Sequence, residues 1–362
     1  MTDILAELAY LHGKPTCKAK LKAKPEHFVV KEQLGFDFSG SGEHLMIKVR
    51  KTGENTSFVA NELAKVCGVK SKDMGWAGQK DRHAVTEQWL SVYLPKADTP
   101  DFTAFEKQYP SIQILETTRH NKKLRPGDLS GNQFQVTLSE VSDISSLESK
   151  IKQVIEKGVP NYFGSQRFGR AGNNLTEARR WGKENVRSKN QNKRSLYLST
   201  ARSWIFNQIV SKRINVNQLS SLMLGDIVRL NTSVSLDDIA NNNESVIVID
   251  NDNLTAMQAE IALDNVVLTA ALVGDNSLPT KQDALCLEQE FIDAEPDLMA
   301  LIRSNRMRHD RRDVLLKPSD FSYTIKDDMA VLCFSLSSGS FATSIVRELI
   351  EEIPVERHFN EG

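Results

Sequence analysis

The chain has 362 residues, of which 40% are hydrophobic and 26% charged, and its formal net charge is −1. This length exceeds what one ordinary core accommodates, so the sequence predicts a globular protein of two domains. No apolar run approaches the ~20 residues that span a bilayer, which argues against a membrane helix. The opening residues lack a basic stretch followed by an apolar one, so we expect no secretory signal and a cytoplasmic location.

The predicted elements change character along the chain. Leu5, Leu8 and Leu11 have the spacing of a short amphipathic helix. Alternating and β-branched residues predict strands, and polar starts with final glycines predict helices. The strands are expected over 27–32, 44–50, 84–94, 111–118 and 132–139, and the helices over 55–68 and 146–158. Later segments predict helices over 199–214 and 294–307, strands or buried segments over 245–250 and 264–275, strand-like sequence from Phe321, and a terminal helix over 340–352.

Strands therefore gather at both ends of the chain, and the middle differs in composition. This clustering, without a regular alternation of strands and helices, predicts the α+β class. It also predicts a first domain made from residues 1–154 and 316–362, interrupted by an inserted domain over residues 155–315.

Charge is segregated although its sum is near zero. Residues 161–194 contain nine Lys/Arg against two Glu, and residues 301–317 contain six against two Asp. Residues 234–300 contain fourteen Asp/Glu and the single Lys281. An early run of lysines adds Lys14, Lys18, Lys20, Lys22 and Lys24. One such block is usually a solvated face, but several basic blocks on a neutral chain favour a surface for a polyanion.

Several kinds of site have no motif in the sequence. The four cysteines are scattered and form no CxxC pair, which argues against a zinc site and fits a reducing compartment. There is no GxxxxGK[ST], GxGxxG, HExxH or GxSxG motif. We therefore expect neither a nucleotide cofactor nor a metal.

One loop concentrates ionisable side chains. In "GWAGQKDRHAVTEQWLSV", residues 75–92, Asp81 stands between Lys80 and Arg82 just before a predicted strand, and Gly75 and Gly78 would let a backbone approach a ligand closely. Adjacent cations favour the charged carboxylate, which could then act as a nucleophile or a base. The alternative is an ordinary charged turn in which Asp81 caps or pairs locally.

The same loop resembles the catalytic motif of the pseudouridine synthase D (TruD) family, whose pattern is AG-x-KDR-x-AVT-x-Q. Four other segments resemble motifs of that family, in family order and over nearly the whole chain: "KPEHFVVKE" (24–32), "LRPGDLSGNQF" (124–134), "PNYFGSQRFGR" (160–170) and "GSFATSIVREL" (339–349). The resemblance implies a pseudouridine-synthase-like catalytic domain with a mostly antiparallel sheet. It also implies an inserted α/β domain characteristic of the family, in a V-shaped arrangement.

The resemblance further implies a reaction and a set of residues. Uridine 13 of tRNA would be isomerised to pseudouridine without a cofactor, with Asp81 as the essential carboxylate. Phe28, Asn132 and Phe341 would approach the substrate, and Asn132 could contact an edge of uracil through its amide. Lys80 would be a second polar contact, to Asp81 or to phosphate, and Phe134 would be a wall of the site or part of the core.

Some of these residues also have structural interpretations. Arg167 and Arg170, which stand among glycines and aromatics, suit contact with phosphate and stacking. The neighbouring aromatics could equally form a hydrophobic seam between domains, with both arginines solvated. Phe28, Phe134 and Phe341 could be plain core residues, and Asn132 could serve only its turn.

Two other functions compete with the enzyme. A non-catalytic RNA-binding protein or RNA chaperone would fit the charge segregation equally well. An RNA methyltransferase would need a Gly-rich cofactor loop after a strand, which the sequence lacks.

Overall fold

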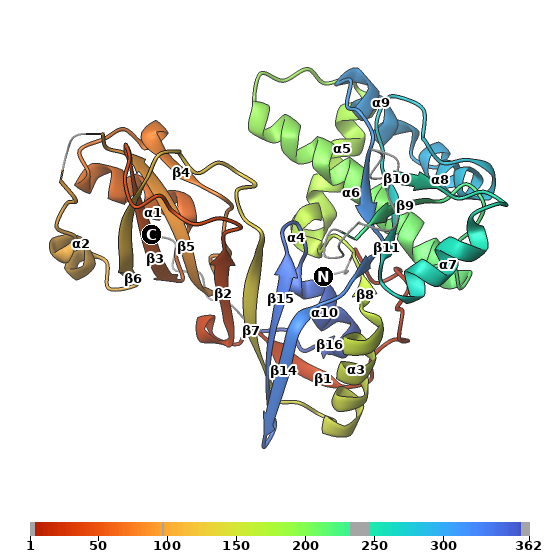
Figure 1. Cartoon of the computed structure of the whole chain (residues 1–362), viewed down its shortest axis with the longest axis horizontal. Coiled ribbons are helices and arrows are strands. Elements are labelled where there is room, and N and C mark those ends of the chain that lie inside the picture. The colour runs from red at the N-terminus through yellow and green to blue at the C-terminus, as the bar shows by residue number, and fades with distance from the viewer. Residues whose placement is uncertain (1–3, 96–97, 232–245, 356–362) are drawn as a thin grey trace. The chain divides into compact units, whose positions relative to one another are not determined.

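The chain forms two compact units, each built from separate segments. A computed structural model describes residues 4–95, 98–231 and 246–355. The sheet unit takes its described residues from Pro15–Ile155, Pro318–Ala342 and Leu349–Gly362. The helical unit takes its described residues from Met1–Lys14, Glu156–Lys317 and Thr343–Glu348. Figure 1 shows the elements of both units.

The sheet unit contains a ten-stranded sheet with a central path β14-β15-β7-β2-β5-β3-β6. The strands are β1 Lys18–Leu21, β2 Phe28–Gln33, β3 His44–Thr52, β4 Met74–Trp76, β5 Val85–Tyr93, β6 Ile112–His120, β7 Gly131–Ser139, β14 Ser319–Lys326, β15 Met329–Ser337 and β16 Glu351–Glu352. Helices α1 Thr56–Val66 and α2 Thr103–Gln108 and the short 3₁₀ turns η1 Pro25–His27 and η2 Ser71–Asp73 also belong to this unit, which takes most of α3 Ile144–Lys157 as well.

Most strand pairs of this sheet are antiparallel. Among the described residues, the parallel pairs are β2 with β5 and β1 with β16. The predicted α+β class with a mostly antiparallel sheet is therefore confirmed. The predicted strands over 27–32, 44–50, 84–94, 111–118 and 132–139 correspond to β2, β3, β5, β6 and β7.

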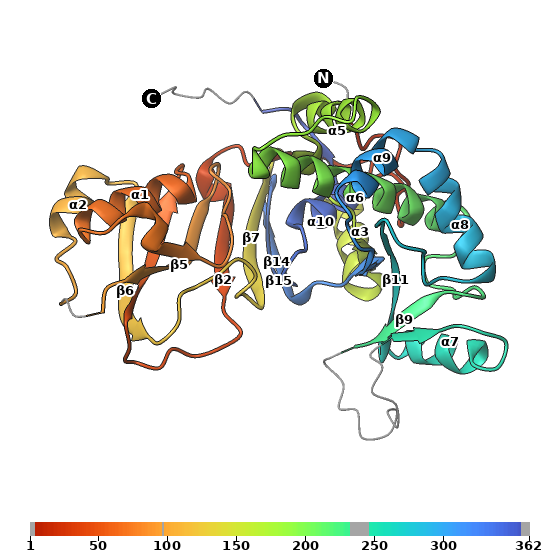
Figure 2. The ribbon, with the colours of Figure 1, turned by 90° about the horizontal axis from the view of Figure 1, so that it is seen from above.

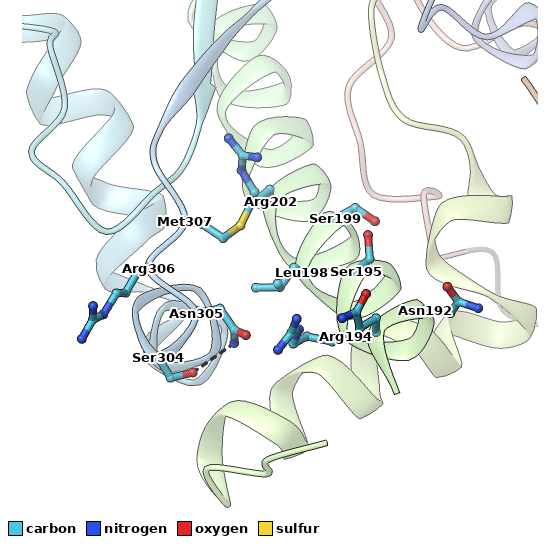
Figure 3. A pocket seen from close by; sticks show the side chains of 11 residues that line it. Asn192, Arg194, Ser195, Leu198, Ser199, Arg202, Ser304, Asn305, Arg306 and Met307 are labelled. Carbon is cyan, nitrogen blue, oxygen red and sulfur yellow. Dashed lines mark hydrogen bonds between the residues drawn. The ribbon is translucent and has the colours of Figure 1, made fainter. Parts of the chain in front are cut away.

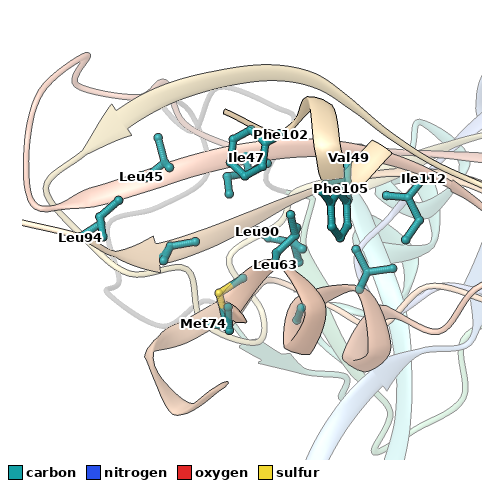
Figure 4. Close-up of a cluster of buried hydrophobic side chains, with 14 residues drawn as sticks. Leu45, Ile47, Val49, Leu63, Met74, Leu90, Leu94, Phe102, Phe105 and Ile112 are labelled. Atoms are coloured by element: carbon teal, nitrogen blue, oxygen red, sulfur yellow. The ribbon is translucent and has the colours of Figure 1, made fainter. Parts of the chain in front are cut away.

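One core of the sheet unit lies between α1 and the strands that it covers. Val59 and Leu63 of α1 are fully buried in one cluster with Ile47 of β3 and Leu90 of β5. Figure 4 shows Leu63, Ile47 and Leu90 among these side chains. The helix covers this sheet because its apolar residues recur three to four positions apart. It ends where Gly68 adopts a left-handed φ of 65°, as the sequence predicts.

The helical unit combines helices with short sheets. Its helices are α4 Ser165–Phe168, α5 Asn173–Lys183, α6 Gln191–Asn215, α7 Leu254–Ala262, α8 Gln282–Asp293, α9 Pro296–Ser304 and most of α10 Ala342–Leu349, and it also contains the 3₁₀ turn η3 Arg170–Gly172. A four-stranded antiparallel sheet has the order β10-β9-β11-β12, with bounds Val246–Val248, Ile227–Leu230, Val266–Leu272 and Asp310–Asp313. Strands β8 Val159–Pro160 and β13 Leu315–Leu316 form a separate pair.

Helix α6 is the centre of the helical unit. It contacts α5, α8, α9 and β11 (Figure 2). The prediction placed this helix over 199–214, but it begins eight residues earlier, at Gln191. The Asn190 side chain caps it by accepting a hydrogen bond of 3.0 Å from the Lys193 amide. The first turns of α6 thus lie inside the segment whose basic composition had set it apart.

The short helix expected around Leu5, Leu8 and Leu11 is wrong, because these residues form turns. Leu5 and Leu8 are buried, as their spacing suggested, but their backbone carbonyls accept hydrogen bonds from the guanidinium of Arg347. A side chain of α10 therefore takes the acceptors that a helix would have used.

The terminal helix also differs from its prediction over 340–352. Helix α10 ends at Leu349, and Glu351–Glu352 forms β16. The Glu351 amide donates to the Cys17 carbonyl and the Ile353 amide to the Ala19 carbonyl, both at 2.8 Å. Backbone pairing with β1 thus replaces the last helical turn, which side-chain periodicity alone does not reveal.

Candidate active site

Asp81 lies in the loop between β4 and β5, and its carboxylate is held at both oxygens. Oδ1 accepts a hydrogen bond of 3.0 Å from the His83 amide, which fixes the turn from within. Oδ2 forms an ion pair with Nζ of Lys22. The Asp81 side chain is 20% exposed, so the carboxylate is constrained yet accessible.

Lys22 directly follows β1 and adopts a left-handed backbone with φ of 55°, which is uncommon for a residue other than glycine. Its side chain is buried, and its ammonium lies 3.9 Å from the centre of the Phe28 ring. The cation therefore contacts both the Asp81 carboxylate and an aromatic face. The sequence had shown Lys22 only as one of five early lysines.

Lys80 and Arg82, the cations next to Asp81 in sequence, have other hydrogen-bond partners. Nζ of Lys80 donates to Oε2 of Glu32 at 2.7 Å, and both side chains are buried. Oε1 of Glu32 also accepts from the Trp89 amide at 3.0 Å, so this pair ties the loop to β2 and β5. Nε of Arg82 donates to the Gly53 carbonyl at 3.2 Å.

Lys51, on β3, holds the loop through hydrogen bonds to backbone carbonyls. Its Nζ donates to the carbonyls of Glu54 at 2.7 Å and of Asp81 at 3.2 Å. The side chain is fully buried, and this burial lowers the pKa of Lys51 from 10.5 to about 8, although the nearby Asp81 and Glu54 act in the opposite direction. Lys51 is thus a second buried cation at the loop that the sequence had not singled out.

Four phenylalanine rings continue from Lys22 across neighbouring strands. The ring centres of Phe28 and Phe134 are 6.0 Å apart, those of Phe134 and Phe334 5.6 Å, and those of Phe334 and Phe321 5.3 Å. We call these four residues the phenylalanine row. Strand register explains it, because Val30 of β2 pairs with Phe134 and Phe134 pairs with Phe334. Phe28 and Phe134 were predicted site residues, whereas Phe334 and Phe321 were not.

Asn132 occupies the next position along the same face of β7. It pairs with Glu32 of β2 and with Leu336 of β15. Its Oδ1 is buried and accepts no hydrogen bond from any described residue. Oγ1 of Thr86, which pairs with Val30, is in the same situation. Buried acceptors without a partner are uncommon, and either atom could accept a hydrogen bond from a ligand or a water.

Three other predicted residues lie elsewhere in the fold. Phe341 is half-buried in the segment between β15 and α10. Arg167 in α4 and Arg170 in η3 belong to the helical unit, whereas Asp81 belongs to the sheet unit. Nη1 of Arg167 donates to Oγ of Ser199 at 3.1 Å, and burial lowers the pKa of Arg167. Arg170 is exposed.

The two glycines of the loop differ in what surrounds them. A Cβ on Gly75 would lie 2.4 Å from the Leu124 carbonyl oxygen and 2.7 Å from Oγ of Ser91, so Gly75 allows the backbone of Leu124 to approach β4 closely. A Cβ on Gly78 would meet nothing nearer than Nζ of Lys80 at 3.7 Å. The space beside Gly75 is filled by the protein itself.

Residues 4–95, 98–231 and 246–355 contain no group of three His, Cys, Asp or Glu side chains that could hold a metal ion. Within the same ranges, none of the helices has both the length and the apolar composition needed to span a bilayer.

Known proteins similar to this chain agree with the motifs. The chain matches the family described as tRNA pseudouridine synthase D (TruD) over residues 5–178 and 173–349. The tRNA pseudouridine synthase D of Vibrio parahaemolyticus is 63% identical over 359 residues, covering 99% of this chain and 100% of the relative. That of Vibrio cholerae is 63% identical over 362 residues, covering 100% of this chain and 97% of the relative.

A solved structure shows the same fold. The crystal structure of a Methanosarcina mazei protein described as a tRNA pseudouridine synthase D superposes with a TM-score of 0.70 and 22% sequence identity. The superposition covers 94% of this chain and 95% of the Methanosarcina mazei chain. Fold, loop and relatives together define an enzyme of the isomerase class, a pseudouridine synthase. More narrowly, the chain belongs to the tRNA pseudouridine synthase D (TruD) family. The prediction of an enzyme is thereby confirmed.

Proposed function

We propose that this enzyme isomerises uridine 13 of tRNA to pseudouridine, with Asp81 as the essential carboxylate. In this reaction the N1–C1′ glycosidic bond breaks, the uracil turns, and C5 bonds to C1′, so that every atom of the nucleotide is kept. The family match and the relatives' names support the substrate class. The single observation that carries the role of Asp81 is its accessible carboxylate, ion-paired to the buried Lys22.

The ion pair suits either chemistry open to Asp81. Asp81 could attack a carbon of the nucleotide as a nucleophile, or take a ribose proton as a base. In either role the carboxylate must be charged and held in a fixed orientation. Lys22 favours the charged form, and the His83 amide fixes the orientation of the carboxylate. Lys80 positions the loop through its ion pair with Glu32, whose carboxylate also accepts a hydrogen bond from the Trp89 amide.

The remaining residues of the sheet unit would hold the base. A uridine that reacts at C1′ must leave its stack, and aromatic faces commonly receive such a base. Phe28 and Phe134 supply that wall, Phe341 approaches the nucleotide from the segment before α10, and Oδ1 of Asn132 accepts from uracil N3–H. The unpartnered state of Oδ1 supports this role.

The two units would divide the work. We propose that the sheet unit is the catalytic domain and that the central part of the helical unit is the inserted domain, close to the predicted range 155–315. Arg167 and Arg170 in the insertion would contact tRNA phosphates. We also infer a cytoplasmic location, since tRNA is the proposed substrate and all four cysteines are free.

Replacement of the carboxylate tests the proposal. Asp81→Asn keeps the size of the side chain and removes its charge, so we expect no pseudouridine at position 13 of an unmodified tRNA transcript. Asp37→Asn, an exposed position of the same unit, is the matched control and should retain full activity. Pseudouridine is mapped by carbodiimide labelling and primer extension. Modification by Asp81→Asn at the wild-type rate would end the proposed mechanism, and modification at another position would end the assignment to uridine 13.

A further inference from the structure

A cavity of about 710 Å³ opens in the helical unit, outside the cluster around Asp81. One wall is the start of α6, with Arg194, Leu198 and Arg202 (Figure 3). The other wall is the segment that follows α9, with Asn305, Arg306 and Met307. Both walls belong to the same unit.

The sequence of α6 explains the first wall. Arg194, Leu198 and Arg202 follow one another at intervals of four residues, which places them on one face of a helix. Leu198 is buried, while Arg194 is exposed and Arg202 half-buried. The basic segment 161–194 and the basic segment 301–317, far apart in the chain, thus meet at one cavity.

The lining of the cavity is positively charged. It contains three arginines and no aspartate or glutamate. Across the described residues, the guanidinium groups of Arg194 and Arg306 have no hydrogen-bond or ion-pair partner. Neighbouring arginines of the unit are paired: Arg179 with Glu295 at 2.5 Å, and Arg180 with Glu177 at 2.9 Å. Other exposed arginines of the unit, such as Arg187 and Arg303, also have no ion-pair partner among the described residues, so the distinguishing feature of the cavity is that three arginines line it.

Arg202 is held in place by backbone carbonyls. Its Nε donates to Val273 at 2.9 Å, and its Nη2 donates to Leu272 at 2.9 Å and to Arg308 at 3.1 Å. Nη1 has no hydrogen-bond partner among the described residues. Because the side chain is already ordered, a ligand that binds Nη1 meets a preorganised donor. Burial lowers the pKa of Arg202, although the nearby Asp310 acts in the opposite direction.

We propose that this cavity binds a phosphodiester of the tRNA at a distance along the RNA from the reacting uridine. The inference rests on the proposed function, since it deepens the substrate contact of the same enzyme. Guanidinium groups bind phosphate oxygens with paired, charge-assisted hydrogen bonds. Arg167, expected from the sequence to contact phosphate, donates to Ser199, another lining residue, and so buttresses the α6 wall.

The composition of the lining favours RNA over an apolar ligand. Leu198 and Met307 are the apolar side chains of the lining, and hydroxyl and amide groups make up the rest beside the arginines. Phosphate contacts of this kind position an RNA without reading its sequence. The cavity would therefore orient tRNA in general and leave choice of the uridine to the sheet unit.

Two matched double variants test the site. Arg194→Ala with Arg306→Ala removes two charges from the cavity. Lys193→Ala with Arg303→Ala removes two charges from adjacent positions that do not line it. Binding of an unmodified tRNA transcript is measured by filter retention at several salt concentrations. Circular dichroism of both variants tests whether they are folded.

We expect the cavity variant to bind tRNA roughly tenfold more weakly, and its salt slope to fall by about one for each lost phosphate contact. The control should stay within about twofold of wild type, and at saturating tRNA both variants should keep the wild-type kcat. Equal weakening in both variants would overturn the site in favour of a general charge effect. If wild-type tRNA affinity persists in the cavity variant while thermal stabilisation by inorganic phosphate is lost, the cavity binds free phosphate and the proposal fails.

The binding assay needs no turnover, so it separates this inference from the proposed function. A wild-type enzyme that binds tRNA but forms no pseudouridine would refute the function and still allow the comparison of variants. Full activity with no difference between the two double variants would refute the cavity alone.

Discussion

At the scale of single residues, the site depends on a pairing between parts of the chain far apart in sequence. Asp81 and Lys22 are separated by 59 positions, and Glu32 and Lys80 by 48. Sequence proximity suggested that Lys80 and Arg82 keep Asp81 charged, but the ion pair on its carboxylate comes from Lys22. The motif could identify the carboxylate, whereas its partner depends on how β1 lies against the loop.

Loss of the Lys22 charge should impair catalysis more than folding. In Lys22→Met the stem remains against the Phe28 ring, but the carboxylate loses its cation, so we expect kcat to fall by roughly a hundredfold. The measurement is single-turnover pseudouridine formation at saturating tRNA. Lys24→Met, an exposed neighbour, is the control and should behave as wild type. A Lys22→Met enzyme with normal kcat would show that the ion pair is only structural.

Lys51 should make the free energy of unfolding rise with pH in the alkaline range. Its folded-state pKa of about 8 lies below its ordinary value of 10.5, so between these values the unfolded chain binds more protons. The free energy of unfolding that Lys51 contributes therefore rises as the pH increases through this window and is lowest below pH 8. The full rise is on the order of 3 kcal/mol.

Urea unfolding of wild type and Lys51→Met at several pH values between 7 and 10.5 measures this contribution. We expect the stability difference, wild type minus variant, to increase with pH. Lys31→Met, an exposed position on β2, should show no such trend. Parallel pH profiles for wild type and Lys51→Met would mean that Lys51 titrates normally.

At the scale of elements, the sequence predicts the strands that carry the candidate site, but it does not predict which strands pair with one another in the sheet. Alternation located β2, β5 and β7, and the glycine and cap signals located α1. The parallel pair of β2 with β5, and the position of β15 beside β7, arise from backbone pairing between distant segments. The phenylalanine row depends on that register, which explains why Phe334 and Phe321 escaped prediction.

Contacts between distant segments also explain the two wrong predictions at the chain ends. The first turns could not be told from a helix by their leucine spacing, since Arg347, more than three hundred residues away, binds their carbonyls. The last turn expected of the terminal helix became β16 through its pairing with β1. In both cases the deciding contact joins residues from opposite ends of the sequence.

The segment 75–78 should tolerate substitution at Gly78, which follows β4, and not at Gly75, which lies within β4. Gly75→Ala forces the new methyl group onto the Leu124 carbonyl, so we expect the free energy of unfolding to fall by about 2 kcal/mol or more. Gly78→Ala places the new methyl group at ordinary van der Waals distance from its neighbours and should change the free energy of unfolding by less than about 1 kcal/mol. Thermal and urea unfolding of both variants provide the comparison. Equal stabilities would show that β4 shifts freely.

At the scale of the whole molecule, the near-zero net charge conceals partial neutralisation within the helical unit. Carboxylates of the acidic stretch pair with arginines of the basic segments: Glu295 with Arg179 and Glu288 with Arg311. The guanidinium groups of Arg194 and Arg306, which line the cavity, have no carboxylate partner among the described residues. The charges that remain unpaired, more than the sum of −1, should therefore govern association with RNA.

The affinity of the wild-type protein for tRNA should fall steeply with salt despite the net charge of −1. We expect at least roughly a tenfold loss between about 50 and about 200 mM salt, because cations at phosphates release counterions. A variant with Asp252→Asn, Asp275→Asn and Asp283→Asn removes three exposed negative charges and should keep the wild-type slope. A flat salt response would contradict the electrostatic argument.

The order in which the sheet is assembled has a consequence for biosynthesis. Strand β7 cannot pair with β15 until β15 has been synthesised, and the whole stretch Glu156–Lys317 is translated between the two strands. At cellular elongation rates that stretch takes on the order of ten to thirty seconds. During this interval the ribosome-bound chain presents an open strand edge and an incomplete phenylalanine row. An unpaired strand edge is prone to aggregation, so the nascent chain is most exposed to this risk before β15 is synthesised.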